Sequence, residues 1–261
     1  MSFNPSVLQA VILDMDGVLW HGDQPIGDLP AAFSRLRQKG FQISLATNNA
    51  TLSVEQYLQK LNRFGVTLQP EQIVTSPEAA VSYLRKRYPK GGAVFLVGEE
   101  GLHSTFTRSG FYFDEVDAVA VVVGLDRGLT YEKLAKASLL IRRGALFIGT
   151  NPDKTLPMPQ GLIPGAGAIL AALNAATDVE PIIVGKPEPE MYLLALERMG
   201  CTPDQTLVVG DRIETDIVGA QRIGCQTALL LSGVTQEEAA RNWSPPVDII
   251  AKDLAELLQR L

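Results

Sequence analysis

Short apolar runs alternate with helical patterns along almost the whole chain. β-Branched runs of this length predict strands, and most of the segments between them predict helices. Such alternation is typical of βαβ units with mostly parallel sheets, and strands that are apolar throughout are expected where helices cover both faces. The predicted strands span residues 7–13, 41–47, 93–98, 118–124, 146–150, 181–184, 207–210 and 227–231, and the clearest helices span residues 31–39, 131–143 and 189–199.

The composition is that of an ordinary globular protein. Of the 261 residues, 46% are hydrophobic and 20% are charged, enough for one large domain or two modest ones. The net charge of −6 and the absence of a basic run argue against nucleic-acid binding. The longest apolar stretch, Val116 to Leu125, is shorter than the ~18 residues of a membrane span and predicts a buried strand. We expect neither a nucleic acid nor a membrane as partner.

The two cysteines indicate a reducing compartment. Cys201 and Cys225 lie far apart and outside any CxxC pattern, so we expect two buried, reduced thiols. The first residues show no basic segment followed by an apolar one, as a secretory signal would. Together these features predict a cytoplasmic protein.

Two acidic residues directly follow the first predicted strand. Asp14 and Asp16 stand at its carboxyl end, and Gly17 comes next. A carboxylate at a buried strand end is costly unless a cation compensates it, most simply a divalent metal together with a phosphate-type substrate. An EF-hand loop does not fit, because Val18 and Pro25 would occupy ligand positions. Since ligands of open α/β sheets bind beyond the carboxyl ends of the strands, the pair predicts a site there.

Three further strand ends carry groups that suit phosphoryl transfer. An aspartate can attack phosphorus, and a second carboxylate can donate and accept protons. A hydroxyl, an amide and a lysine can bind the phosphoryl oxygens. Carboxylates that gather around a phosphate repel one another, so a cation is needed, and all-oxygen ligands favour Mg²⁺. The three strand ends carry Thr47-Asn48-Asn49, Gly185-Lys186-Pro187, and Asp211 with Asp216.

In this order, the segments resemble the four motifs of the haloacid dehalogenase (HAD) superfamily, over nearly the full chain. The matching strings are Asp14-Met15-Asp16-Gly17-Val18, Thr47-Asn48, Lys186, and Gly210 to Asp216. The resemblance implies a Rossmann-like, doubly wound parallel α/β core and catalysis with Mg²⁺. It implies that Asp14 is the nucleophile and a metal ligand, and that Asp16 is the general acid/base with its backbone carbonyl on the metal. By the same resemblance Thr47 and Lys186 bind phosphate with Asn48 beside them, Asp211 binds the metal directly, and Asp216 binds it through water.

Asp16 and the motif spacing indicate one branch of this superfamily. The dehalogenase branch lacks an acid at that position because a halide leaves without a proton, so Asp16 favours phosphate esters. Asp14 and Thr47 are 33 positions apart, too few for a helical cap, whereas the 139 positions from Thr47 to Lys186 fit an inserted domain. The chain thus resembles the NagD-like, type-IIA branch, whose members dephosphorylate nucleotides, pyridoxal phosphate, phosphoglycolate or 4-nitrophenyl phosphate. We expect a catalytic core of residues 1–77 and 180–261 and an inserted α/β cap of residues 78–179.

The predicted cap supplies further candidate substrate contacts. Asn151 to Gly167 is rich in proline and glycine and predicts a long ordered loop after a strand, where binding residues often collect. Asn151 and Asp153 in this loop, together with Asn49, are candidates for substrate contact. Trp20 and Trp243 are interpreted as packing residues, and the sequence does not decide whether His21 and Arg212 have a role in the site.

The sequence therefore predicts a Mg²⁺-dependent phosphatase that hydrolyses a small phosphorylated metabolite through an aspartyl-phosphate. A phosphotransferase on the same scaffold and a catalytically inactive phosphometabolite sensor remain alternatives. The natural substrate and the oligomeric state cannot be read from the residues, although the resemblance is compatible with a homodimer formed through the cap.

Overall fold

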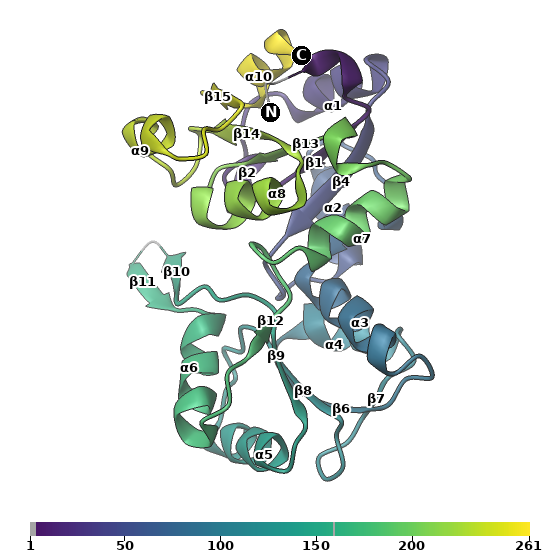
Figure 1. The fold of residues 1–261 in the computed structure, drawn as a ribbon, viewed down its shortest axis with the longest axis vertical. Coiled ribbons are helices and arrows are strands. Elements are labelled where there is room, and N and C mark those ends of the chain that lie inside the picture. The colour runs from purple at the N-terminus through teal and green to yellow at the C-terminus, as the bar shows by residue number, and fades with distance from the viewer. Residues whose placement is uncertain (1–3, 159) are drawn as a thin grey trace. The chain divides into compact units, whose positions relative to one another are not determined.

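The computed structural model describes residues 4–158 and 160–261, and the chain divides into two compact units (Figure 1). The first unit contains the residues up to Thr47 together with residues 55–74 and 186–261. The second unit contains residues 48–54 and 75–185. Within the described residues, none of the helices has the length and apolarity that a membrane span requires.

A six-stranded sheet forms the centre of the first unit. Its strand order is β15-β14-β13-β1-β4-β5, and β1 pairs in parallel with both β13 and β4. Leu13, the last residue of β1, lies opposite Val209 and Leu45, so these three strands end at one edge. The strands are β1 (Ala10–Leu13), β4 (Gln42–Thr47), β5 (Ile73–Thr75), β13 (Thr206–Gly210), β14 (Gln226–Leu230) and β15 (Ile249–Ala251).

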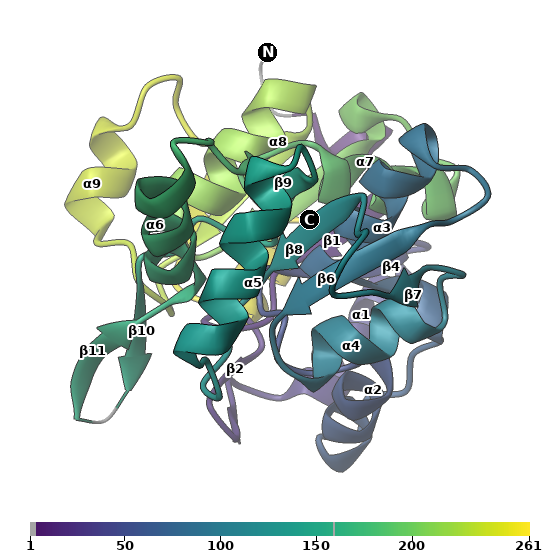
Figure 2. The same ribbon diagram turned by 90° about the horizontal axis from the view of Figure 1, so that it is seen from below.

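Helices cover both faces of this sheet, which confirms the predicted doubly wound α/β fold. Figure 2 shows β1 and β4 between α7 and α8 on one side and α1 and α2 on the other. All four residues of β1 are buried, which explains its continuous apolar run. The helices are α1 (Leu29–Gln38), α2 (Val54–Arg63), α7 (Glu190–Met199), α8 (Val218–Ile223), α9 (Glu237–Asn242) and α10 (Leu254–Arg260). A short hairpin of β2 (Trp20–His21) and β3 (Gln24–Pro25) follows the first motif.

The second unit has a parallel sheet of its own, with strand order β12-β9-β8-β6-β7. Its core lies between the sheet and the helices α5 and α6, where Leu140, Phe147 and Leu170 are buried together. The helices α3 and α4 pack against each other. The elements are α3 (Ser76–Arg87), β6 (Ala93–Val97), α4 (Glu100–Thr107), β7 (Tyr112–Phe113), β8 (Ala120–Val123), α5 (Tyr131–Arg142), β9 (Leu146–Gly149), α6 (Ala166–Thr177) and β12 (Ile182–Ile183).

One predicted strand is present in another sheet, and another prediction is wrong. The strand expected over residues 181–184 is present as β12, but it pairs with β9 in the sheet of the second unit and not with the other motif strands. The run Val116 to Leu125 is not a buried strand throughout, because Val116 is 62% exposed and β8 begins only at Ala120. The carboxylate of Asp114 accepts the N–H groups of Val116 and Asp117, and this turn prevents an extended strand there.

The segment from Asn151 to Gly167 is also more regular than the predicted loop. It contains an antiparallel hairpin of β10 (Thr155–Met158) and β11 (Gly161–Pro164). Both strands of a two-stranded sheet are edge strands, and edge strands tolerate proline although it has no N–H to donate. The expectation of two buried thiols is met by Cys225 but not by Cys201, which is partly exposed just after the left-handed cap of α7.

Candidate active site

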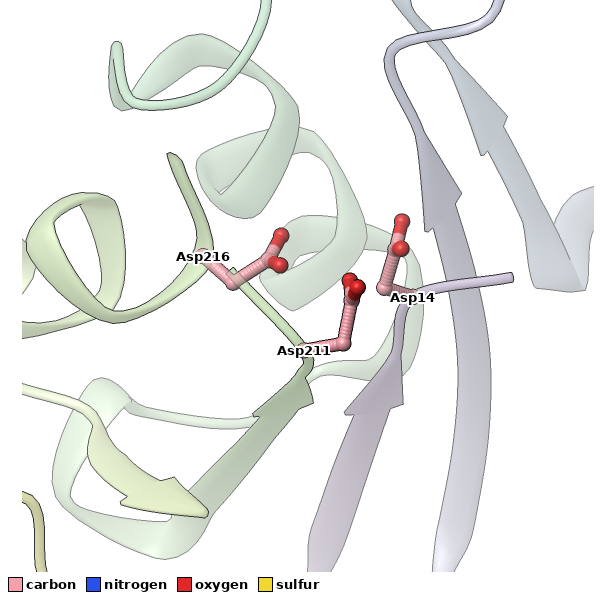
Figure 3. Close-up of side chains that lie close together, drawn as sticks. All are labelled: Asp14, Asp211 and Asp216. Carbon is pink, nitrogen blue, oxygen red and sulfur yellow. The ribbon is translucent and has the colours of Figure 1, made fainter. Parts of the chain in front are cut away.

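Three acidic side chains meet at the carboxyl ends of β1 and β13. Asp14 follows β1, and its N–H donates to the carbonyl of Val209 on β13 over 2.8 Å. Asp211 follows β13, and Asp216 lies in the π-helical turn Ile213–Ile217 that comes next. One carboxylate oxygen from each aspartate lies within 4.8 Å of the other two. Figure 3 shows Asp216 reaching toward the neighbouring Asp14 and Asp211. Parallel pairing of β1 with β13 thus brings distant parts of the sequence into one acidic cluster.

A buried lysine joins the acidic cluster. Nζ of Lys186 lies 2.5 Å from Oδ1 of Asp14 and 2.7 Å from Oδ1 of Asp216, and it also donates to the carbonyl of Ala46 at 3.1 Å. Its side chain is only 4% exposed. Burial lowers the pKa of Lys186, but the Asp14 and Asp216 carboxylates more than offset this and hold that pKa well above its ordinary value. The ammonium therefore stays charged and connects the ends of β1 and β4 with the turn after β13.

Lys186 does not neutralise the acidic cluster, since three carboxylates and one ammonium leave two negative charges. Burial raises the pKa of Asp14 well above its ordinary value against the effect of Lys186, with Asp216 and Asp211 adding to the rise. Burial and the neighbouring Asp216 also raise the pKa of Asp211. Burial and mutual repulsion thus disfavour the ionised form of these carboxylates, and a further positive charge beside them would favour it. A divalent cation that prefers oxygen ligands, such as Mg²⁺, fits both the charge and the donor atoms.

The loop after β14 fixes Asp211. The N–H of Val234 donates to Oδ2 of Asp211 over 2.8 Å, and the N–H of Thr235 donates to its carbonyl over 3.1 Å. A Cβ on Gly233 would lie 1.9 Å from the same Oδ2, so the loop can approach this closely only with glycine. The hydroxyl of Ser232 donates to the carbonyl of Gly17 over 2.7 Å. No sequence motif predicted this loop, although a glycine shortly after a strand is a signal of close backbone approach.

The turn that carries Asp216 is stabilised by contacts that no sequence motif predicted. The N–H of Arg212 donates to Oδ2 of Asp216 over 3.1 Å. The hydroxyl of Tyr192, a fully buried residue of α7, lies 3.2 Å from the carbonyl oxygens of both Thr215 and Asp216. Single π-helical turns are rare and frequently occur at functional sites. Arg212 therefore has a structural contact through its backbone, and the role of its side chain stays undecided.

Asp16 and Thr47 each have a neighbour that holds the side chain. The carboxylate of Asp16 is exposed, and its Oδ1 accepts the indole N–H of Trp20 over 2.9 Å. Thr47 is 2% exposed at the end of β4, and its side chain hydrogen-bonds to that of Tyr57 on α2. Burial raises the pKa of Tyr57 far above its ordinary value, so the phenol stays protonated. His21 is exposed in the β2–β3 hairpin.

The remaining predicted site residues belong to the second unit. Asn151 donates from its side chain to the carbonyl of Asn48 over 2.9 Å and accepts the N–H of Asp153 over 3.1 Å. The side chain of Asn49 accepts the N–H and the hydroxyl of Thr51 in a local turn. The structure thus brings Asn48, Asn151 and Asp153 together, and the substrate contacts expected of these residues stay predictions.

Comparisons with known proteins agree with this geometry. Residues 11–112 match the family model of haloacid dehalogenase-like hydrolases, and residues 183–257 match a HAD-hydrolase-like model. An acid sugar phosphatase from Staphylococcus aureus is 37% identical over 97% of this chain and 98% of its own length. The chain belongs to the HAD-like hydrolases.

Solved structures of HAD-like hydrolases resemble this one over nearly its whole length. A p-nitrophenyl phosphatase from Archaeoglobus fulgidus has a TM-score of 0.91 and 32% identity, with 97% of this chain and 99% of that chain covered. NagD from E. coli K-12 has a TM-score of 0.88 and 29% identity, with coverages of 95% and 98%. A glycerol phosphate phosphatase from Mycobacterium tuberculosis in complex with magnesium has a TM-score of 0.88 and 34% identity, with coverages of 96% and 76%. The predicted NagD-like membership is confirmed, and the chain is an enzyme of this phosphatase family.

Proposed function

We propose that this HAD-like enzyme is a Mg²⁺-dependent phosphatase that hydrolyses small phosphomonoesters through an aspartyl-phosphate on Asp14. One observation carries the proposal: the Asp14 carboxylate stands at the end of β1, paired with the Lys186 ammonium and next to Asp211 and Asp216. The arrangement combines a nucleophile, a fixed positive charge and a set of oxygen ligands. The names of the relatives, which include sugar, nitrophenyl and glycerol phosphate phosphatases, support small phosphate esters as substrates.

In the first step the carboxylate of Asp14 attacks phosphorus. A bond forms between a carboxylate oxygen and phosphorus while the bond from phosphorus to the ester oxygen breaks, and its electron pair stays on the leaving oxygen. Asp16 gives its proton to that oxygen, so that an alcohol leaves rather than an alkoxide. Lys186 and Thr47 hold the phosphoryl oxygens, whose charge must be stabilised during transfer.

In the second step water attacks the phosphorus of the aspartyl-phosphate. The Asp16 carboxylate takes a proton from the water molecule, the bond between Asp14 and phosphorus breaks, and its electron pair returns to the Asp14 carboxylate. Inorganic phosphate is released, and Asp16 is again protonated for the next cycle. The exposure of Asp16 suits this role, because water must reach it.

Asp14, Asp211 and Asp216 would hold Mg²⁺, which supplies positive charge next to the phosphoryl group when it is bound. The family resemblance adds the backbone carbonyl of Asp16 as a further ligand and a water molecule between Asp216 and the ion. The two negative charges that Lys186 leaves uncompensated support this assignment.

The second unit contains the segment predicted as a cap, residues 78–179, and we assign it the role of covering the site and selecting substrates. A cap that closes excludes bulk water from the reaction and limits substrate size. Asn49, Asn151 and Asp153 are our candidates for contact with the part of the substrate beyond the phosphate. Both cysteines are free, which supports a cytoplasmic location. A homodimer through the cap stays a prediction.

A turnover assay with 4-nitrophenyl phosphate and a panel of phosphorylated metabolites tests the proposal. Replacement of the nucleophile in Asp14→Asn should remove nearly all turnover while the circular dichroism spectrum stays that of the wild type. Mass spectrometry of acid-quenched wild-type enzyme should detect a phosphoryl group on Asp14. Retention of most activity in Asp14→Asn would contradict the mechanism. Transfer to an added alcohol instead of water would identify a phosphotransferase, and binding without turnover would identify a sensor.

A further inference from the structure

The carboxylate of Asp16 is held by a buried indole. Nε1 of Trp20 lies 2.9 Å from Oδ1 of Asp16, while Trp20 itself is 0% exposed. Among the described residues, no other hydrogen bond to the Asp16 side chain is present. A short polar side chain at the surface is thus anchored by a large side chain that is fully enclosed in the first unit.

The backbone between the two residues makes this contact possible. The N–H groups of Val18, Leu19 and Trp20 all point to the carbonyl of Met15, and the N–H of Gly17 donates to the carbonyl of Trp20 over 2.8 Å. Gly17 has a φ of +85°, which a residue with a Cβ adopts only with strain. The chain therefore closes a tight turn after Asp16 and returns the ring of Trp20 to the carboxylate.

Two residues at the end of α2 or just beyond it keep the ring in place. Nζ of Lys60 lies 4.4 Å from the ring centroid of Trp20 and donates to the carbonyl of Gly22 over 2.6 Å. The ring of Phe64 packs against the indole with centroids 5.8 Å apart. A fully buried ring with these neighbours has one orientation, so its N–H points at a fixed place.

We propose that Trp20 is the positioning residue for proton transfer by Asp16, which rests on the phosphatase mechanism proposed above. An indole N–H can only donate, so the oxygen that it faces must be an acceptor. The indole N–H therefore occupies Oδ1 and leaves Oδ2 as the oxygen that carries the transferred proton. Oδ2 gives this proton to the leaving oxygen as the ester bond breaks, and Oδ2 receives the proton of the attacking water in the second step.

The test compares two substrates of similar size whose leaving groups differ in their need for a proton. Nitrophenolate leaves readily without one, whereas the leaving oxygen of phenyl phosphate depends more on an acid. Trp20→Phe keeps an aromatic ring and removes the N–H. We expect kcat/KM for phenyl phosphate to fall on the order of tenfold, as for the loss of one hydrogen bond to a charged group, and kcat/KM for 4-nitrophenyl phosphate to fall by less than about threefold.

Two comparison variants show what the result means. Asp16→Asn removes the acid and should show the same selectivity more strongly. Trp243→Phe removes an indole N–H that donates to Gln221 and not to Asp16, so the ratio of the two substrates should stay that of the wild type. An equal fall for both substrates in Trp20→Phe would mean that Trp20 only packs, and it would overturn the proposal. Absence of selectivity in Asp16→Asn would overturn it together with the acid role of Asp16. Absence of all turnover in the wild type would instead reject the phosphatase function itself.

A second measurement does not depend on the stability of Trp20→Phe. The chain has two tryptophans, so ¹⁵N-tryptophan labelling yields two indole N–H signals, and Trp243, which donates to Gln221 over 3.2 Å, serves as an internal reference. Asp16→Ala removes only an exposed carboxylate. The Trp20 signal should then shift upfield and exchange faster with solvent while the Trp243 signal stays in place. A Trp20 signal that does not respond to Asp16→Ala would overturn the proposal.

Discussion

Replacement of Lys186 by methionine tests how much of the stability of the first unit depends on the charge balance at the acidic cluster. Methionine keeps most of the length of the side chain and removes the ammonium. The variant loses three contacts of Nζ, at 2.5 Å to Asp14, 2.7 Å to Asp216 and 3.1 Å to the carbonyl of Ala46. It also removes the buried ammonium that compensates the carboxylates of Asp14 and Asp216.

The expected magnitude follows from burial. The side chains of Lys186 and Asp216 are 4% and 2% exposed, so water cannot replace the lost ammonium. Loss of one partner from a buried ion pair costs about 3–5 kcal/mol of unfolding free energy. We expect the lower end of this range, because the pKa values of Asp14 and Asp211 are already raised and a carboxylate that binds a proton relieves part of the repulsion.

Urea unfolding in the presence of a chelator measures this loss. Trp20 and Trp243 both lie in the first unit, so intrinsic fluorescence follows the unfolding of the unit that contains Lys186. Arg222→Met is the matched control, because Arg222 pairs with Glu188 at 3.1 Å while their side chains are 53% and 42% exposed. Such an exposed pair contributes about 0–1 kcal/mol. A loss in Lys186→Met no larger than that in Arg222→Met would refute the reasoning from burial.

Three further predictions concern the site. Treatment with a chelator should abolish turnover and added Mg²⁺ should restore it; full activity without divalent metal would contradict the metal assignment. Gly233→Ala places a Cβ 1.9 Å from Oδ2 of Asp211. The overpacking costs about 1–3 kcal/mol, and it should weaken Mg²⁺ binding roughly tenfold or more, as measured by isothermal titration calorimetry. The control Gly92→Ala should bind Mg²⁺ as the wild type does, because its Cβ meets only a methyl group of Val119 at 3.2 Å. Tyr57→Phe removes the hydrogen bond to Thr47. The variant should have an unfolding free energy lower by about 1 kcal/mol and a higher KM for all phosphate esters. An unchanged KM would show that Thr47 needs no support from Tyr57.

The strand ends that carry the chemistry could be predicted because each follows a local pattern. The apolar run before Asp14 and the one before Asp211 become the buried strands β1 and β13, and parallel pairing places their ends together. Lys186 shows the limit of this reasoning. The strand before it, β12, belongs to the sheet of the second unit, and the lysine reaches the acidic cluster only after the chain has left that sheet. An apolar run of two to four residues does not specify its partner strand, because any open sheet edge can pair with it.

By itself the sequence determined the alternation of strands and helices and the chemical groups at their ends, since both depend on residue type and on spacing along the chain. Only the tertiary structure decided which of these groups touch. The indole of Trp20 reaches Asp16 because Gly17 permits a left-handed turn, and the backbone at Val234 reaches Asp211 because Gly233 permits a close approach. Contacts of this kind depend on backbone angles and on packing between elements that are distant in the sequence, which no periodic pattern of residues encodes.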